Sequence, residues 1–143
     1  MITVRDVLDS KGRQVWSVSP GDSVFQALEL MSTRHAGALM VVENEKLVGV
    51  ISERDYARKV VLAGKNSRQT AVGDIMTSKV YYVSPDHRIE ECMALMTSKS
   101  VRHLPVLQDG RLDGVISIGD VVKAVISHQE FIIEQLEHFI AGR

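Results

Sequence analysis

The sequence is short of the residues that mark several large classes of protein. Cys92 is its only cysteine, so the chain can form no internal disulfide and carries no Cys-x-x-Cys metal or redox motif. Aromatic residues make up only 5% of the chain, and no run approaches the ~18 apolar residues that a membrane-spanning helix requires. The first ten residues carry charges and lack the apolar segment and cleavage site of a secretory signal. These absences favour a soluble, cytoplasmic protein without a membrane segment.

Neither sign of charge predominates. The chain has 17 basic and 18 acidic residues, a net charge of -1 and a pI near 6.5. Nucleic-acid-binding proteins usually show a clustered basic excess, so a nucleic-acid partner is not expected, and any anion site must be local. The content of 45% hydrophobic and 24% charged residues is ordinary for a globular domain, and 143 residues suffice for a compact core.

Catalytic and metal-binding motifs are missing as well. The five histidines show no His-Glu-x-x-His or His-Cys ligand spacing, and there is no Gly-x-Ser-x-Gly or Gly-rich phosphate-loop motif. The paired acids Glu90 and Glu91 are typical of a solvated helix face. Cys92 lies in the apolar pattern IEECMALM, which favours a buried side chain over a reactive thiol. We therefore predict that the chain is not an enzyme and has no catalytic residue, metal site or required cofactor.

The sequence does contain a duplication. The segment GVISERD at 49–55 returns as GVISIGD at 114–120, and identical residues recur throughout the chain at this offset of 65. Upstream, VRDVL at 4–8 pairs with VGDIM at 72–76 at an offset of 68. One copy of ~60 residues would bury only about 60% of its unfolded surface. We therefore expect the two copies to form a pseudo-twofold pair that shares one core.

Each copy predicts the same order of elements, β-α-β-β-α. Hydrophobic periodicity and turn residues place a strand, a helix, a hairpin and a second helix in each copy. In the first copy these are expected at about 15–18, 23–34, 38–52 and 53–63, and in the second at about 80–83, 88–99, 103–117 and 118–127. The prediction is an α+β fold with a first repeat at 1–66, a second at 67–127 and an amphipathic helix at 128–143.

The repeated Ser-x-x-Asp turn permits two interpretations. Ser52 with Asp55, and Ser117 with Asp120, each follow a strand and open a helix, which is the pattern of a capping box. The same turn presents free amide groups and a partial positive charge to a phosphate, and its carboxylate can bind the vicinal hydroxyls of a ribose. The spacing alone leaves both interpretations open.

The differences between the copies concern cations. Inside the turn, the first copy has Arg54 and the second has Gly119. In the preceding strand, the first copy has Gly37-Ala38 and the second has Arg102-His103. Arg54 either binds phosphate or is an ordinary solvated arginine. His103 is the only histidine beside the expected site. If the fold brings Arg54, Arg102 and His103 together, their common target is an anion.

These segments, above all the twin GVIS-x-x-D, resemble the CBS-domain pair, or Bateman module, over roughly residues 4–125. The resemblance implies that adenosine compounds such as AMP, ATP, NAD or S-adenosylmethionine bind in two clefts between the repeats. It implies that Asp55 and Asp120 hold ribose hydroxyls and that five residues face phosphate: Ser52, Arg54, Arg102, His103 and Ser117. The adenine slots are expected at Val18, Ala36, Gly37 and Ala38 for one cleft and at Val80, Tyr82 and Val101 for the other.

Two details of this expectation stay open. Tyr82 either stacks on a base or is a packing residue of its strand. Gly119, opposite Arg54, makes the cleft at Asp120 the weaker one or one that prefers a different phosphate length.

The sequence thus supports a regulatory module that binds adenosine nucleotides. The alternative is a ligand-free dimerisation or partner-docking protein, suggested by an apolar stripe in the last segment at Ile132, Leu136, Phe139 and Ile140. That stripe packs on its own domain, pairs with another subunit or receives a partner helix. The resemblance implies a homodimer, because members of that family commonly associate as dimers, and an unidentified regulated protein is the other expected partner.

Overall fold

The structure, a computed structural model, describes residues 2–140 and separates into two compact units. The first-repeat unit contains residues 14–81 and 109–112. The second-repeat unit contains the residues up to 13, residues 82–108 and the residues from 113 on. The two units are described in turn below.

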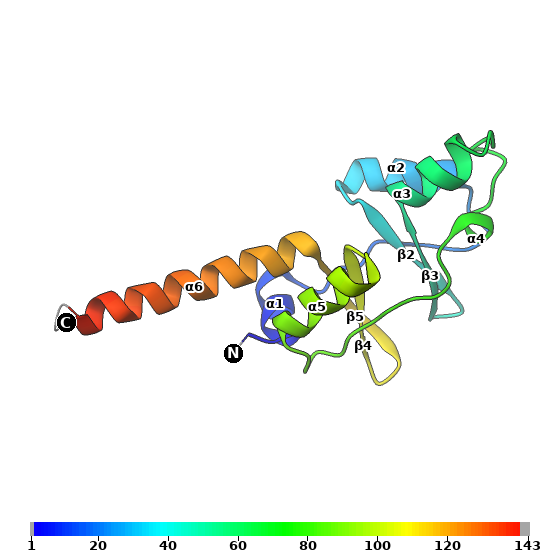
Figure 1. Ribbon diagram of the computed structural model, residues 1–143. Coiled ribbons are helices and arrows are strands. Elements are labelled where there is room, and N and C mark those ends of the chain that lie inside the picture. Colours follow the sequence, from blue (N-terminus) through cyan, green and yellow to red (C-terminus); the bar gives the residue numbers. More distant parts are fainter. Residues whose placement is uncertain (1, 141–143) are drawn as a thin grey trace. The chain divides into compact units, whose positions relative to one another are not determined.

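The first-repeat unit is a three-stranded sheet with helices (Figure 1). Its elements are β1 (Ser17–Val18), α2 (Val24–Arg34), β2 (Ala38–Glu43), β3 (Lys46–Ser52), α3 (Glu53–Tyr56), the π-helix η1 (Ala57–Val61) and α4 (Val72–Ile75). The strand order is β1-β2-β3, with β1 parallel and β3 antiparallel to β2. The helix expected at 53–63 is therefore split into α3 and one π turn, which the Leu62 amide closes by donating to the Ala57 carbonyl at 3.0 Å.

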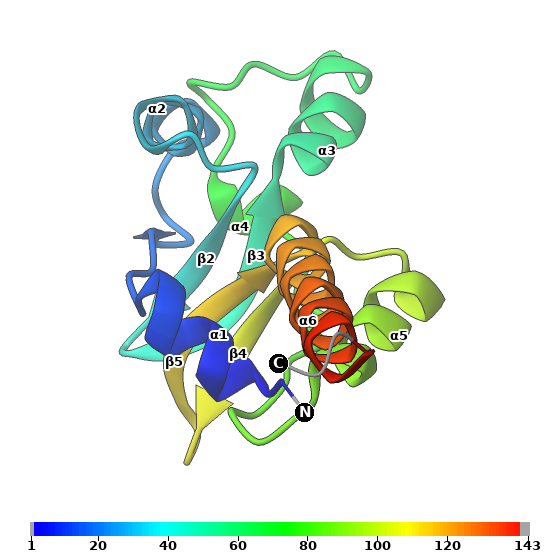
Figure 2. The same ribbon diagram turned by 90° about the vertical axis from the view of Figure 1, so that its left-hand side faces the viewer.

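The second-repeat unit has a two-stranded sheet and three helices. Its elements are α1 (Val4–Lys11), α5 (Ile89–Lys99), β4 (His103–Gln108), β5 (Arg111–Ser117) and α6 (Ile118–Ile140). Only one bridge, from Val83 to Val106, forms where a strand was expected at 80–83. Figures 1 and 2 show α5 beside the first turns of α6, where Val121 is buried. The helix expected at 118–127 and the one expected at 128–143 are a single helix as far as Ile140.

The two long helices of the repeats bury the same positions. In α2, Val24, Ala27 and Met31 are buried, and Ile89, Cys92 and Met96 are their counterparts in α5. The spacing i, i+3, i+7 puts each set on one face of its helix. In the first-repeat unit this face packs against Leu39, Val41 and Ile51 of the hairpin. The duplicated hydrophobic pattern therefore builds the same packing in both units.

The hairpins also repeat in detail. Asn44 and Glu45 have φ of 51° and 65°, and Asp109 and Gly110 have φ of 52° and 75°. Two consecutive residues with positive φ are typical of the type I′ turn, whose twist matches that of the flanking strands. Both turns were expected from their polar residues.

Each unit is completed by the short helix at the start of the other repeat. In the first-repeat unit, the amides of Val72 and Gly73 donate to the carbonyls of Asp22 and Pro20 at 2.8 and 2.9 Å. This attaches α4 to the Ser-Pro bend that follows β1.

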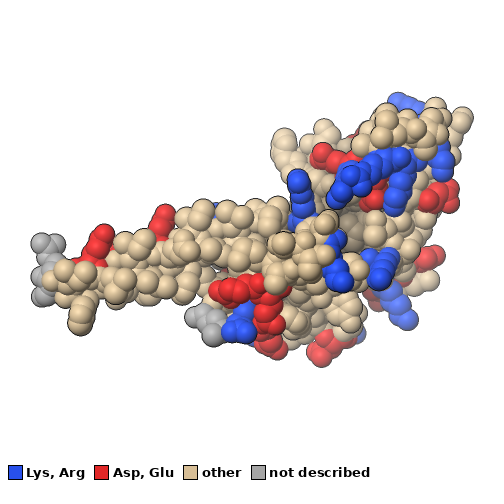
Figure 3. Space-filling view, in the orientation of Figure 1, with Lys and Arg blue, Asp and Glu red and all other residues tan. Residues whose placement is uncertain are grey.

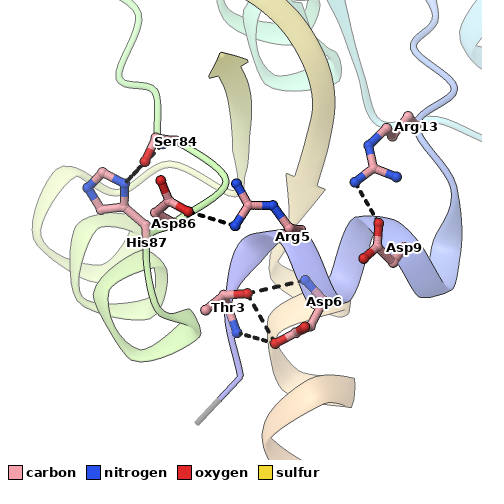
Figure 4. Close-up of polar contacts among 8 residues, drawn as sticks. All are labelled: Thr3, Arg5, Asp6, Asp9, Arg13, Ser84, Asp86 and His87. Atoms are coloured by element: carbon pink, nitrogen blue, oxygen red, sulfur yellow. Dashed lines mark hydrogen bonds and ion pairs between the residues drawn. The ribbon is translucent and has the colours of Figure 1, made fainter. Parts of the chain in front are cut away.

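The second-repeat unit takes its equivalent helix from the other end of the chain. The amides of Val4 and Arg5 donate to the carbonyls of His87 and Pro85 at 2.8 and 2.9 Å. Figure 4 shows Arg5 also paired with Asp86, at 2.6 Å. The α1 helix belongs to the start of the first repeat in sequence, yet it packs in the unit of the second.

Candidate functional site

The Ser52–Asp55 turn is a closed capping box between β3 and α3. The Asp55 amide donates to Ser52 Oγ at 3.1 Å, and Asp55 Oδ2 accepts from the Ser52 amide and hydroxyl at 3.0 and 3.1 Å. Its other oxygen, Oδ1, accepts from Thr77 Oγ1 at 3.2 Å and pairs with Lys59 Nζ at 3.1 Å. Both carboxylate oxygens of Asp55 are thus occupied by the protein itself.

The Ser117–Asp120 turn is a capping box at the start of α6. The Asp120 amide donates to Ser117 Oγ at 3.1 Å, and Asp120 Oδ2 accepts from the Ser117 amide at 2.9 Å. The same Oδ2 pairs with Lys11 Nζ at 2.7 Å, and Lys11 Nζ also donates to the Val115 carbonyl at 2.9 Å. Within residues 2–140, Asp120 Oδ1 has no hydrogen-bond partner. The capping interpretation of both turns is confirmed.

The surroundings of Asp120 favour its charged form. Burial raises the pKa of Asp120, but the hydrogen bond from Lys11, the Ser117 amide and the positive charge of Lys11 together hold the pKa below its usual value. The carboxylate is therefore ionised at neutral pH and can accept hydrogen bonds from sugar hydroxyls.

The residues before each hairpin lie next to the turn of their own unit. Ala38 pairs with Ser52, and the Gly37 carbonyl accepts from the Glu53 amide at 3.1 Å. In the other unit, the Arg102 carbonyl accepts from the Ile118 amide at 2.8 Å. One free amide of each helix start is therefore already used by the backbone and is not available to a phosphate.

The predicted phosphate-binding side chains differ in exposure. Arg54 and Arg102 are exposed, and so is Gly119, whereas His103 is half-buried at the start of β4. The Arg102 backbone lies at the Ser117 turn, and Arg54 is part of the Ser52 turn. The expected meeting of all three cations stays a prediction, because Arg54 belongs to the other unit.

The predicted adenine-binding residues are spread over both units. The first-repeat unit holds Val18, Ala36, Gly37, Ala38 and Val80, and the second-repeat unit holds Tyr82 and Val101. Val18 is buried and pairs with Val41, while Tyr82 is 60% exposed. The amides of Ala36 and Val101 close the ends of α2 and α5 by donating to Met31 and Met96 at 3.0 and 3.1 Å. The adenine slots stay a prediction.

Sequence reasoning did not find Lys11, Lys59 and Thr77, which contact the two acids. One signal was available: Ser10-Lys11 recurs as Ser78-Lys79 at the offset of 68 that relates α1 to α4. The signal does not say which acid the lysines reach.

Three further findings concern the described residues. Cys92 is buried, as expected, and burial raises the pKa of its thiol to about 11. Between residues 2 and 140, no three His, Cys, Asp or Glu side chains lie close enough to hold a metal ion. Over the same stretch, no helix combines the length and apolar character needed to cross a membrane.

The sequence model of the CBS domain matches residues 4–62 and 72–127. The chain belongs to the CBS-domain family. The α+β fold class and the pair of CBS repeats expected from the sequence are thereby confirmed, and CBS-domain pairs are regulatory modules.

Three known proteins illustrate the similarity. The mitochondrial CBS domain-containing protein CBSX3 of Arabidopsis thaliana is 39% identical over 150 residues, which cover 98% of this chain and 72% of that protein. A crystallised putative signal-transduction protein with CBS domains from Burkholderia ambifaria is 50% identical, with a TM-score of 0.86 and coverage of 89% and 96%.

The third is a CBS domain pair crystallised with 5′-methylthioadenosine and S-adenosyl-L-methionine. It superposes with a TM-score of 0.78 over 90% of this chain and 98% of that chain. At 22% identity, this likeness shows the fold alone.

Proposed function

We propose that this chain is a regulatory module that binds an adenosine-containing nucleotide, AMP, ATP or NAD, at its two Ser-x-x-Asp turns. The observation that carries the proposal is the start of α6. There an ionised carboxylate, Asp120, and an ammonium group, Lys11 Nζ, lie 2.7 Å apart at the positive end of a 23-residue helix. Sugar hydroxyls are donors for the carboxylate, and phosphate oxygens are acceptors for the ammonium and the helix amides.

The ligand enters as an effector and not as a substrate. No nucleophile, base and oxyanion-binding group are grouped together in the geometry described above, so nothing in it supports a reaction. The module acts by changing its affinity for a regulated protein, which requires that the nucleotide favour one state of the module over another. A cytoplasmic location, a homodimer and the lack of a nucleic-acid partner belong to the same proposal.

Calorimetry and thermal melting with a panel of adenosine compounds test the proposal. The panel contains AMP, ATP and NAD. It also contains 5′-methylthioadenosine and S-adenosyl-L-methionine, the two compounds crystallised with the third protein described above. A ligand at 100 times its dissociation constant adds about 2.7 kcal/mol to the free energy of unfolding. At about 3 °C per kcal/mol, the melting temperature rises by roughly 8 °C.

The matched variants are Asp55→Ala and Asp120→Ala, with Glu29→Gln as a control that removes an exposed acid on α2. The control keeps the full melting shift, and at least one of the two site variants reduces it. A wild-type protein that responds to no compound of the panel contradicts the proposal.

The second candidate function, ligand-free self-association, is supported by the second half of α6. Figure 3 shows few charged groups along the visible side of this helix. Ile132, Leu136, Phe139 and Ile140 are 43%, 55%, 84% and 83% exposed. In this alternative, a second copy covers the stripe. Leu136→Glu then converts a dimer to a monomer on a sizing column without changing the helical content, and an unchanged elution volume contradicts this role.

A further inference from the structure

We infer that the two Ser-x-x-Asp turns are unequal: the turn at Asp120 is the principal ribose site, and Lys11 supplies its phosphate contact. This inference rests on the proposed function and says which of the two turns performs it, and with which cation.

The first step is the number of hydrogen bonds that each carboxylate already accepts. A carboxylate has about four lone-pair positions. Asp55 has four partners, since the Ser52 amide and hydroxyl lie at Oδ2 and Thr77 Oγ1 and Lys59 Nζ lie at Oδ1. A ribose can bind there only by displacing two of these partners.

Asp120 has room for the same ligand. Two partners, the Ser117 amide and Lys11 Nζ, lie at Oδ2, and the Ser117 hydroxyl also helps to lower the pKa of this carboxylate. In the described part of the chain, Oδ1 has no partner. The carboxylate is also the more accessible of the two, with a side chain 21% exposed against 13% for Asp55. Two vicinal hydroxyls can therefore donate to Asp120 while its capping bond and ion pair stay in place.

Lys11 provides the cation that the second copy lacks inside its turn. Gly119 stands where the first copy has Arg54, so the turn itself offers no positive side chain. Lys11 reaches it from the end of α1 and is held by Asp120 and the Val115 carbonyl. An ammonium group has three donors, and these contacts use two of them. The third is left for a phosphate oxygen of a nucleotide whose ribose lies on Asp120.

The lysine at the equivalent position of the other copy offers a matched control. Lys79 corresponds to Lys11 at the offset of 68, yet the acid of its own unit, Asp55, is paired with Lys59. Lys79 lies 5.9 Å from the centre of the Tyr81 ring. A change at Lys79 removes the same charge without touching either turn.

The first experiment is a calorimetric titration of wild type, Asp120→Asn and Asp55→Asn with AMP. We expect one principal site per chain in wild type, a loss of at least tenfold in affinity in Asp120→Asn, and less than a threefold change in Asp55→Asn. The inference is overturned if Asp55→Asn causes the larger loss, or if wild type shows two equal sites.

The second experiment compares adenosine with AMP in Lys11→Gln, Lys11→Arg and Lys79→Gln. If Lys11 contacts phosphate, Lys11→Gln weakens AMP about tenfold and leaves adenosine within twofold. Lys11→Arg, which keeps the positive charge, recovers most of the AMP affinity, and Lys79→Gln binds both compounds as wild type does. If Lys11→Gln weakens AMP and adenosine equally, Lys11 only supports the fold and its phosphate contact is refuted. A melting curve for each variant checks that α1 remains folded.

The two proposals fail in different ways. If no adenosine compound binds wild type, the proposed function fails, and this inference fails with it. If AMP binds but Asp120→Asn leaves its affinity unchanged, the proposed function survives and the inequality of the turns is wrong.

Discussion

Gly114 of β5 lies so close to Leu8 of α1 that a methyl group has no room between them. A Cβ atom at Gly114 would lie 2.7 Å from Leu8 Cδ2 and 3.1 Å from Leu8 Cδ1. Leu8 is fully buried, so its side chain cannot turn out into solvent. Gly114→Ala must therefore shift α1 or force Leu8 from its rotamer, and overpacking of this kind costs about 1 to 3 kcal/mol.

Thermal melting followed by circular dichroism measures this cost. At about 3 °C per kcal/mol, Gly114→Ala melts roughly 3 to 9 °C below wild type. Gly21→Ala is the control, because no atom lies within 4 Å of a Cβ atom there. The corresponding change in the first-repeat unit, Gly49→Ala, brings its methyl group to 2.6 Å from Met76 Sδ. The methionine side chain can adapt, but the methyl group would also lie 3.1 Å from the Thr77 backbone oxygen, so Gly49→Ala destabilises as well.

A double-mutant cycle identifies Leu8 as the cause. Leu8→Ala alone leaves a cavity and costs about 2 to 5 kcal/mol. Combined with Gly114→Ala, the new methyl group enters part of the vacated space, and the pair is destabilised by about 0.5 to 3 kcal/mol less than the sum of the two changes. Two results contradict this reasoning: Gly114→Ala has the same melting temperature as Gly21→Ala, or the effects of Gly114→Ala and Leu8→Ala are additive. In either case α1 does not pack on β5, and the assignment of α1 to the second-repeat unit is wrong.

Three further predictions concern stability. Because burial raises the pKa of Cys92 from 9.0 to about 11, the folded chain keeps a proton that the unfolded chain loses. The free energy of unfolding therefore falls by about 2 kcal/mol as the pH rises from 9 to 11. Urea titrations should show that Cys92→Ala lacks this part of the loss. Glu45→Gly removes the strain of a positive φ, less the entropic cost of a glycine, and raises the free energy of unfolding by roughly 0.5 kcal/mol. Gly110→Ala at the equivalent position of the other hairpin lowers the free energy of unfolding by about 1 kcal/mol. Equal effects of the two changes refute the turn assignment. Ser23→Ala removes the cap of α2 and lowers the free energy of unfolding by about 0.5 to 2 kcal/mol, which thermal melting measures. An unchanged melting temperature means that the cap does not form in solution.

Local patterns in the sequence predicted most of the elements. The helices at 24–34 and 89–99 and both hairpins lie within two residues of their expected positions. Each depends on periodicity, caps and turn residues that are close together in the chain. Of the strand expected at 80–83, only the bridge at Val83 forms. Strand pairing depends on a partner that is distant in the chain, and a pattern of four residues carries no information about that partner.

In the candidate site, too, contacts between neighbours in the chain were predictable and contacts between distant residues were not. The capping boxes at Ser52 and Ser117 follow from a spacing of three residues and were predictable. The contact between Lys11 and Asp120 joins residues 109 positions apart, and no local pattern indicates it. From Gly119 alone, the comparison of the two copies predicted that the site at Asp120 is weaker or prefers a different phosphate length, whereas the structure supplies a cation from α1.

The duplication also explains how equal sequences produce unequal turns. Asp55 finds Lys59 and Thr77 within 22 positions along the chain, so the first-repeat unit closes its turn with its own residues. Ala124 stands where a counterpart of Lys59 would be, and the second turn has to take its cation from α1. The helix that brings Lys11 also brings Leu8 against Gly114, so packing and charge at Asp120 depend on one segment. Under our proposal, a nucleotide that binds Asp120 and Lys11 stabilises the attachment of α1, whereas one bound at Asp55 does not, and this difference would suit the second turn to sense a ligand.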